Sequence, residues 1–472
     1  MSRRPLVLAL ALVLAPLAAN AEDLLQTYEL ARAGDPTYSA AESSRLITKE
    51  GAVQARANLL PHLDGRAGYT KNWTDSTGTQ VFGTTAVPSD GSNDNTNKQW
   101  GVNLSQMVYD HSSIMRLKSA NALSKASDFQ LESESDSLIT RTSAAYFNVL
   151  VQLENLAAAE ASETALKKQF DFASKRLEVG LAPITDVHEA RAQYDSARAN
   201  TITARNLVED AYNALTEITG KPVANLKALP EDFQPQLPEH ADEDKWVQMA
   251  YDNNPALKAK EFQVKSAEDD IGTARAGHYP TLYLGGNYGS SRTDGTSTDN
   301  LEPNPALRVL DFENKNDSKS IGLTLTVPIF AGGATQSGVR QAIATRDVRQ
   351  DEYETQRRAL ERNTRNAYQT VVAGVSEVEA RRLAVVSAKA AYDASQVGLE
   401  VGTRTVLDVL VNQRNLFQSQ QAYALARYNF LQSVLNLEQA AGTLDIDDVQ
   451  KVNRFLTVDV SAASVEAQAP KQ

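Results

Sequence analysis

The sequence predicts an α+β membrane protein made from two copies of one unit, with strands and long helices in each copy. The first observation is an internal repeat: Pro61 returns as Pro280 and Gly180 as Gly402, with matching neighbours, 219 and 222 residues later. So small a drift in the offset indicates a tandem duplication. The other two observations are apolar alternation in segments of about ten residues and two segments of about 65 residues almost free of Pro and Gly.

Residues 1–21 have the pattern of a secretory signal peptide. Arg3 and Arg4 precede an apolar run over 6–17, and Ala19-Asn20-Ala21 offers small residues for cleavage before Glu22. The run is too short to cross a bilayer as a helix. The chain has no Cys, so an N-terminal lipid anchor on Cys is excluded, and an exported chain must gain its stability from packing or oligomerisation.

The charge excludes one class of partner. Lys and Arg number 47 against 59 Asp and Glu, a net charge of -12, and loss of the signal peptide removes two arginines. An acidic chain without a basic cluster argues against nucleic acid. After Glu22 no apolar stretch reaches the length of a spanning helix, so an exported chain of this kind could cross an outer membrane only as a closed β-barrel.

The repeat divides the chain into segments. We expect the first structural repeat over 22–229, a proline-containing linker over 230–244 and the second structural repeat over 245–442. The C-terminal segment 443–472 follows, and its tail after about Leu456 is small, polar and expected to be disordered. Each repeat is predicted to run helix, strand, polar loop, strand, long helix, turn, helix.

Alternation places the strands. In the first repeat, helices near 26–33 and up to Leu60 end at Pro61, which cannot donate to a helix. Apolar residues then occupy every second position in four segments: 63–70, 102–108, 282–288 and 321–330. This length and pattern fit a tilted outer-membrane strand, although a half-buried strand in a soluble sheet would look the same.

Polar segments separate the paired strands. Residues 75–97 and 291–317 are rich in Ser, Thr, Asn, Asp and Gly, and we expect them to form loops. Trp73 and Trp100 flank the first of these, where an aromatic girdle would sit at a membrane surface.

The helical segments come as long and short partners. Residues 111–179 contain no Pro or Gly, and 334–397 contain only Gly338 and Gly374. Shorter helices over 184–219 and 405–441 should return antiparallel to them after a Gly-bearing turn. Apolar residues at heptad spacing predict a coiled-coil seam on each return helix: Leu207, Ala211, Ala214 and Ile218, and then Ala424, Tyr428, Leu431 and Leu435.

Four strands per chain imply an oligomer if they enter a membrane. An open sheet edge in lipid leaves unpaired backbone groups at several kcal/mol each, and the smallest membrane barrels have eight strands. Two chains would supply eight strands and three would supply twelve. This arithmetic does not choose between a dimer and a trimer.

The motifs resemble those of the TolC-type outer-membrane channel proteins of Gram-negative bacteria, over nearly all of the mature chain. Three sets of residues carry the resemblance: Val179-Gly180-Leu181 with Ile184-Thr185-Asp186-Val187 and its repeat from Val401 to Val409, the run Val327-Pro328-Ile329-Phe330 with Gly332-Gly333, and Ala426-Arg427-Tyr428-Asn429.

The resemblance implies a homotrimer in the outer membrane. Its 12-strand β-barrel, four strands per chain, would be continued by a 12-helix periplasmic α-barrel with coiled-coil tips and a mixed equatorial belt. It implies a passive exit duct for tripartite efflux pumps, type I secretion systems or both, with no enzymatic activity. The duct would be opened at its periplasmic end by an adaptor protein and an inner-membrane transporter of the RND or ABC type.

The resemblance also assigns residues at the helical tips. It implies a gate formed by Thr185, Asp186, Arg404 and Asp408, with one Asp408 per chain making a carboxylate ring. Adaptor contacts would fall on Val179, Gly180, Leu181, Val401, Gly402, Thr403 and Thr405. The family often has Tyr where Leu399 stands and Asp where Val411 stands, so one hydrogen bond and a second acidic ring are missing here.

No cofactor or metal is expected, because the five histidines lie far apart without ligand spacing. Two alternatives remain at this stage. One is an exported structural or adhesive coiled coil whose strands form a soluble sheet. The other is a channel dedicated to protein secretion.

Overall fold

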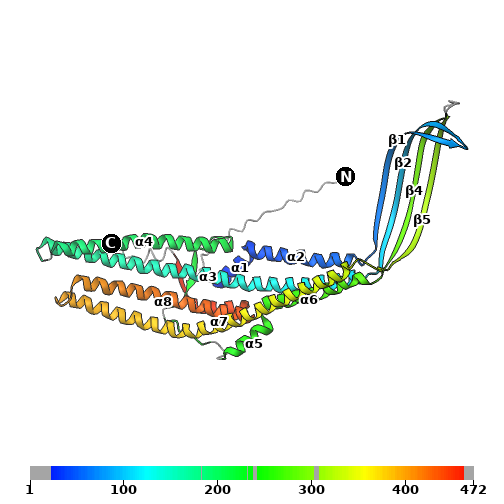
Figure 1. The fold of residues 1–472 in the computed structure, drawn as a ribbon. Helices are drawn as coiled ribbons and strands as arrows, with labels where there is room; N and C mark the ends of the chain where they lie inside the picture. The colour runs from blue at the N-terminus through cyan, green and yellow to red at the C-terminus, as the bar shows by residue number, and fades with distance from the viewer. Residues whose placement is uncertain (1–22, 182, 231, 238–241, 302–307, 462–472) are drawn as a thin grey trace, which may run out of the picture. The chain divides into compact units, whose positions relative to one another are not determined.

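A computed structural model describes residues 23–181, 183–230, 232–237, 242–301 and 308–461. These fall into two compact units, whose elements are labelled in Figure 1. The first unit takes residues up to 44, 128–258 and those from 354 onward, and the second takes 45–127 and 259–353. The predicted signal peptide, parts of the predicted linker and the end of the tail lie outside the described residues.

The helices and strands follow the predicted repeat. No helix within the described ranges is long and apolar enough to cross a membrane. In chain order the elements are α1 (Leu24–Gly34), α2 (Pro36–Ala57), β1 (His62–Phe82), β2 (Thr85–Tyr109), α3 (His111–Glu178), α4 (Ile184–Thr219), β3 (Asn225–Ala228), α5 (Glu243–Asn253), α6 (Pro255–Arg275), η1 (Ala276–His278), β4 (Thr281–Leu301), β5 (Arg308–Thr326), α7 (Ala334–Glu400), α8 (Val406–Ala441), α9 (Ile446–Asn453) and β6 (Val458–Ser461).

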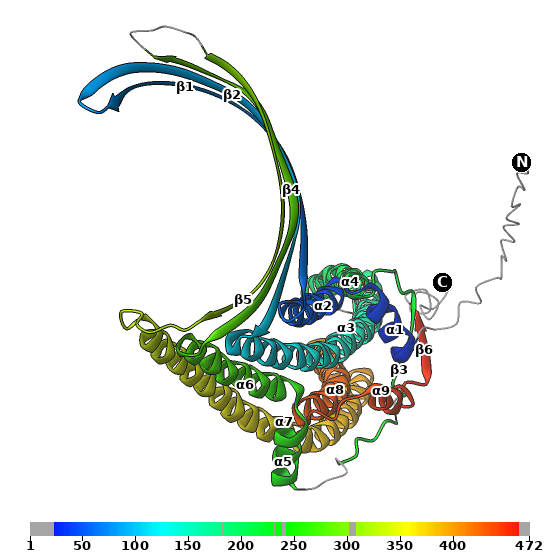
Figure 2. The ribbon, with the colours of Figure 1, turned by 90° about the vertical axis from the view of Figure 1, so that its right-hand side faces the viewer.

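The second unit contains a four-stranded antiparallel sheet in the order β1-β2-β4-β5. Its strands are long and curve together (Figure 2). The loops predicted over 75–97 and 291–317 are wrong for nearly all of their described residues, because β1, β2, β4 and β5 extend through them and leave a turn at 83–84. Polar residues can pair in a sheet as well as apolar ones once a tight turn fixes the register. The β1–β2 hairpin turns over Gly83 and Thr84, and Gly83 has φ 65°.

The two faces of the sheet differ in polarity near its helical end. Residues directly opposite each other share a face, and one such row joins Leu63, Leu104, Gly286 and Ile321. The next row, on the other face, joins Asp64, Asn103, Asn287 and Ser320. Ile321 is 78% exposed and Leu63 70% exposed, so an apolar face lies open in the single chain.

The structure differs from the prediction at the end of β5 and in the C-terminal tail. Strand β5 stops at Thr326, so Val327 and Ile329 lie outside it. Residues 458–461, expected in a disordered tail, form β6 and pair antiparallel with β3, with Leu226 opposite Val460. Because β3 follows α4 and β6 ends the described chain, this pairing joins segments that the sequence places far apart.

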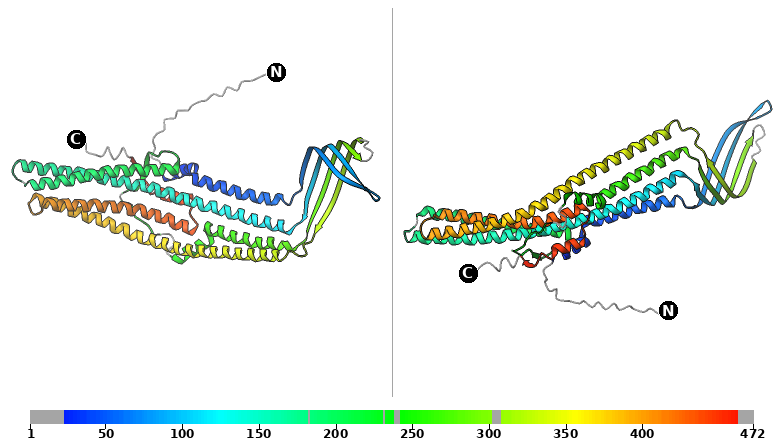
Figure 3. Two further views of the ribbon diagram at one scale, coloured as in Figure 1. Left: turned by 45° about the horizontal axis from the view of Figure 1, so that its top comes forward. Right: turned by 90° about the horizontal axis from the view of Figure 1, so that it is seen from below.

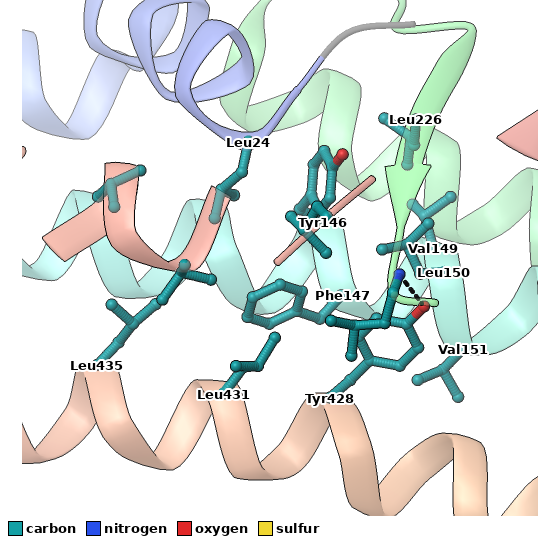
Figure 4. Packing of buried hydrophobic residues seen from close by; sticks show 14 of the residues in the cluster. Leu24, Tyr146, Phe147, Val149, Leu150, Val151, Leu226, Tyr428, Leu431 and Leu435 are labelled. Atoms are coloured by element: carbon teal, nitrogen blue, oxygen red, sulfur yellow. Dashed lines mark hydrogen bonds between the residues drawn. The ribbon is translucent and has the colours of Figure 1, made fainter. Parts of the chain in front are cut away.

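The first unit holds two helical hairpins, α3 with α4 and α7 with α8, whose turns lie at the same end (Figure 3). Its core gathers large side chains from α1, α3, β3 and α8, including Leu24, Tyr146, Leu226, Tyr428 and Leu435, all at most 1% exposed (Figure 4). Tyr146 is tied to β3, because its hydroxyl donates to the carbonyl of Lys227 at 2.9 Å. The core therefore fixes the short sheet against both hairpins.

The predicted seams are confirmed on one return helix and wrong in part on the other. On α8, Ala424, Tyr428, Leu431 and Leu435 are all buried. On α4, Leu207 and Ala214 are exposed, and the buried residues are Val208, Ala211, Leu215 and Thr219. The buried stripe keeps Ala211 and otherwise lies one residue further along, because small or apolar residues occupy adjacent positions there and the heptad pattern fits both sets.

The duplication is visible in equivalent junctions. Gly220 ends α4 and Gly442 ends α8, both with positive φ. A Cβ on Gly34 would lie 2.4 Å from the Thr219 carbonyl oxygen, and one on Gly442 would lie 2.5 Å from the backbone of Asn254. In each repeat, the start of the second helix therefore packs against the end of the return helix: α2 against α4, and α6 against α8.

One buried pair differs between the repeats. Arg141 donates to Asp35 at 2.6 Å, and Asp35 is 4% exposed. Burial opposes the charge of Asp35, but the hydrogen bond from Arg141 holds the pKa of the carboxyl below its usual value. The equivalent positions in the second repeat are Asn254 and Asn363, so two neutral amides replace the ion pair.

Candidate functional site

The turn between α3 and α4 forms the first tip. Gly180 has φ 74°, and the Leu181 amide donates back to the Arg176 carbonyl at 2.8 Å, which closes the end of α3. Val179 and Leu181 are 68% and 67% exposed. The sequence prediction of a Gly-bearing turn is confirmed, and it presents apolar side chains to the surroundings.

The turn between α7 and α8 repeats this geometry. Gly402 has φ 76°, Val401 is 68% exposed, and the Thr403 and Arg404 amides both donate to the Gly398 carbonyl, at 2.8 and 3.1 Å. Two exposed apolar tips of the same shape thus lie at the same end of the unit.

The two return helices begin differently. Asp408 and Thr405 form a capping box at α8, in which Asp408 Oδ2 accepts from the Thr405 amide and from the Thr405 hydroxyl, each at 2.9 Å. At α4 the N-cap is Pro183, which offers no side-chain cap. The start of α8 is therefore fixed more firmly than the start of α4.

The charge of Asp408 is favoured by this cap. The backbone hydrogen bond from Thr405 is the main cause, the Thr405 hydroxyl and the charge of Arg404 add to it, and together they hold the pKa of Asp408 below its usual value. Asp408 therefore stays ionised in mildly acidic solution.

The predicted gate residues come together only in part. Arg404 lies near Asp408 and packs over Gly398, where a Cβ would lie 2.6 Å from Arg404 Cγ. Asp186 accepts a long hydrogen bond of 3.5 Å from its neighbour Thr185. Across the described part of the single chain, no hydrogen bond or ion pair joins Asp186 to Arg404.

A cavity of about 1000 Å³ lies between the hairpins near the tips. Phe172 and Tyr392 line it, as do Gln169 and Gln413. Gln413 is 3% exposed, yet its Nε2 has no hydrogen-bond partner. Aromatic and amide side chains from both hairpins therefore face a common cavity at this level.

Sequence reasoning missed an ion pair that joins the hairpins deeper in the unit. Arg427 donates to both carboxylate oxygens of Glu154, at 2.8 and 2.7 Å, and to the Pro230 carbonyl at 3.1 Å. The Tyr428 hydroxyl donates to the same carboxylate at 3.0 Å, and burial raises the pKa of Tyr428. Arg427 is 6% exposed, and a charged residue beside a seam position was the available signal.

The described residues contain no group of three or more His, Cys, Asp or Glu side chains placed to hold a metal ion. The arrangement offers exposed apolar turns and a capped, charged Asp408, which suit contact with a partner.

Comparisons with known proteins agree over nearly the whole chain. Residues 27–221 and 246–443 match the family described as outer membrane efflux protein. The chain is 33% identical to the outer membrane protein TolC of Vibrio cholerae, over 96% of this chain and 98% of that one. It is 27% identical to the alkaline protease secretion protein AprF of Pseudomonas aeruginosa, over 91% and 86% of the two chains.

Solved structures share the fold. The outer-membrane channel CmeC of Campylobacter jejuni superposes with a TM-score of 0.72 at 18% identity, covering 93% of this chain and 91% of that one. A membrane protein from Pseudomonas aeruginosa superposes with a TM-score of 0.70 at 21% identity, covering 89% and 91%.

These relatives support a channel and not the structural or adhesive alternative. Efflux and secretion proteins both occur among the relatives, so the match does not single out a channel dedicated to protein secretion. The chain therefore belongs to the outer membrane efflux protein family: it is a passive exit duct for efflux and secretion in the outer membrane of a Gram-negative bacterium, with a large periplasmic part, and it is not an enzyme.

Proposed function

We propose that three copies of this chain close one 12-strand β-barrel and continue it as a 12-helix periplasmic α-barrel. The observation that carries this proposal is the sheet with two open edges. β1 and β5 run 21 and 19 residues along these edges, and one face of the sheet exposes large apolar side chains. An open edge in lipid is too costly to persist, so pairing β1 of one copy with β5 of the next satisfies both edges.

Twelve strands suit a duct better than eight. An eight-strand barrel is just wide enough to be filled by its own side chains, whereas larger barrels leave a lumen. The family relationship favours the same number. The polar face that carries Asp64, Asn103 and Ser320 would then line the passage.

The tips form the gate in this proposal. Thr185 and Asp186 of one copy meet Arg404 of the next, and the Asp408 carboxylates form a ring. This arrangement agrees with the single chain, in which Asp186 and Arg404 are not joined. Exposed ion pairs are each worth about 0–1 kcal/mol, and weak individual contacts suit a closed state that a partner must open.

The exposed tip residues are the adaptor contacts: Val179, Gly180, Leu181, Val401, Gly402, Thr403 and Thr405. An adaptor that binds the open arrangement more tightly would shift the equilibrium toward it. The adaptor would connect the duct to an inner-membrane transporter of the RND or ABC type.

Cysteine placement tests the assembly and the partner together, because the chain has no Cys of its own. Gly180→Cys and Gly402→Cys, each labelled with a photo-crosslinker in intact cells, should capture a periplasmic adaptor. Mass measurement of the purified oligomer in detergent should give three chains. A monomer or dimer that conducts ions would contradict the barrel proposal, and absence of an adaptor product at both sites would contradict the tip assignment.

A further inference from the structure

Charged side chains gather on one face of the sheet at one level. The rows that contain Ala67, Tyr69 and Lys71 lie on the same face as the exposed apolar row of Leu63. Together with Lys319 in the row of Gly65, they carry eight charged residues from four strands: Lys71, Lys98, Arg292, Asp294, Glu313, Lys315, Asp317 and Lys319. We call these eight residues the charged belt.

The opposite face carries a single charged residue at the same level, Arg66, and its two rows nearest to Lys98 and Lys315 are uncharged. These two rows join Gly68 to Gln99, Ser291 and Asn316, and Thr70 to Asn97, Thr293 and Asn314. Charges that served only to solvate the hairpins should be shared more evenly between the two faces than eight against one. The sorting indicates that the charges serve the surroundings of the sheet and not its proposed lumen.

The charged belt lies at the border of the exposed apolar face, on the side away from the helical end of the sheet. From Leu325 to Lys315 the strand β5 advances ten residues, which is roughly 34 Å along the strand and about 25 Å in height at the usual tilt. That height is about the thickness of the apolar band of an outer-membrane barrel. Trp100 and Tyr288 pack edge to face with centroids 5.6 Å apart, just below the row of Lys98 and Arg292, where interfacial aromatic residues belong.

The belt is basic in an acidic protein. Five of its residues are cationic and three are anionic, whereas the whole chain carries a net charge of -12. Lys98, Arg292 and Lys315 lie side by side in one row on three adjacent strands. Their side chains are 56%, 52% and 63% exposed, so they can reach an external group.

Acidic neighbours arrange these bases and leave part of each free. Arg292 contacts Asp294 at 2.8 Å and Glu313 at 2.9 Å, and Lys315 contacts Asp317 at 3.3 Å. Lys71 and Lys319 lie over aromatic rings instead, at 4.9 Å from the Trp73 centroid and 5.3 Å from the Tyr288 centroid. Fixed cations beside an apolar band match a ligand that has an anionic head and acyl chains.

We propose that the charged belt binds the phosphate groups of a phosphorylated glycolipid of the outer leaflet, with Lys98, Arg292 and Lys315 as the phosphate ligands. Arg and Lys favour phosphate through charge-assisted hydrogen bonds, and the acyl chains would lie against Leu63, Leu104 and Ile321. This inference rests on the proposed barrel, which turns this face toward lipid.

The test is lipid retention by the purified full-length oligomer, measured by native mass spectrometry with bis-phosphorylated lipid A as the probe. Lys98→Gln with Lys315→Gln should weaken binding about tenfold or more, because glutamine cannot replace the charge-assisted hydrogen bonds that these lysines donate to phosphate. Lys49→Gln with Lys118→Gln removes two exposed lysines from helices of the same unit, and binding should change less than about twofold. Glu313→Gln should strengthen binding, since it removes a competitor for Arg292.

Three outcomes would overturn the proposal: equal binding by the belt variant and the parent, equal binding of the dephosphorylated glycolipid, or full displacement of the lipid by millimolar inorganic phosphate. Single-channel conductance separates this proposal from the barrel proposal. Conducting variants that have lost lipid support the site, while a parent protein that neither oligomerises nor conducts refutes the barrel itself.

Discussion

The ion pair between Glu154 and Arg427 should be a main determinant of how firmly the two hairpins are joined. Glu154→Gln leaves the guanidinium of Arg427, 6% exposed, without its carboxylate. Removing one partner of a fully buried pair costs about 3–5 kcal/mol, and Glu154 itself is 31% exposed, which places this pair at the lower end. We expect about 3 kcal/mol, because the Pro230 carbonyl still accepts from Arg427 at 3.1 Å and glutamine keeps one acceptor oxygen.

The assay is guanidinium-induced unfolding of the oligomer in detergent, followed by the helical circular dichroism signal. The double variant Glu154→Gln with Arg427→Gln should lose less than the sum of the two single variants, since the lone buried charge is gone. The repeat supplies a matched control. Arg205 is equivalent to Arg427 and contacts Glu160 at 2.8 Å, but it is 57% exposed. Arg205→Gln should cost no more than about 1 kcal/mol.

Equal losses of unfolding free energy for Arg205→Gln and Arg427→Gln would refute this expectation. The two arginines lie at similar distances from their carboxylates and differ in burial. A loss below about 1 kcal/mol for Glu154→Gln would also refute it, since a buried unpaired charge must cost more than a surface one.

The remaining predictions concern the gate, the bore, pH and one junction. Arg404→Glu should loosen the closed tips and raise single-channel conductance in a planar bilayer; unchanged conductance would remove Arg404 from the gate. Reversal potentials in a salt gradient should show mild cation selectivity, reduced in Asp408→Asn, and anion preference in the parent would contradict the carboxylate ring. Burial and a neighbouring carboxylate raise the pKa of Asp136 to about 7, so the folded state binds its proton more tightly and stability falls as pH rises from about 4 to about 7. Asp136→Asn should therefore be more stable than the parent at pH 8, by on the order of 1–4 kcal/mol, with little difference near pH 4, and parallel pH profiles would contradict the assignment. Gly442→Ala should lower the unfolding free energy by about 1–3 kcal/mol, because φ is 71° and the new Cβ would meet backbone at 2.5 Å, whereas Gly338→Ala has open space and should be neutral or stabilising.

Much of the fold could be predicted from periodicity and breakers. The absence of Pro and Gly marked α3 and α7 to within a few residues, and Gly180 and Gly402 marked both turns. The polar parts of β1, β2, β4 and β5 could not be predicted in this way. Apolar alternation ends where each hairpin extends beyond the apolar face of the sheet, although the backbone pairing continues.

The site was predictable only where local chemistry defines it. The cap formed by Thr405 and Asp408 follows from residues three positions apart. The contact of Glu154 with Arg427 joins residues 273 positions apart, so the place of Arg427 beside a seam residue could suggest its burial but could not identify its partner. The pairing of Asp186 with Arg404 is a property of neighbouring copies and stays a prediction.

The exchange of Asp35 and Arg141 for Asn254 and Asn363 constrains how the two repeats diverged. A single change would have left either a lone carboxylate at Asp35, which is 4% exposed, or a lone guanidinium at Arg141, which is 36% exposed, and the first costs far more than the second. A typical domain has only about 5–15 kcal/mol to lose. The route through the lone arginine is therefore the less costly one, because its guanidinium can be solvated while the pair is incomplete. The two repeats of one chain thus keep the charged form and the neutral form of the same pair of positions.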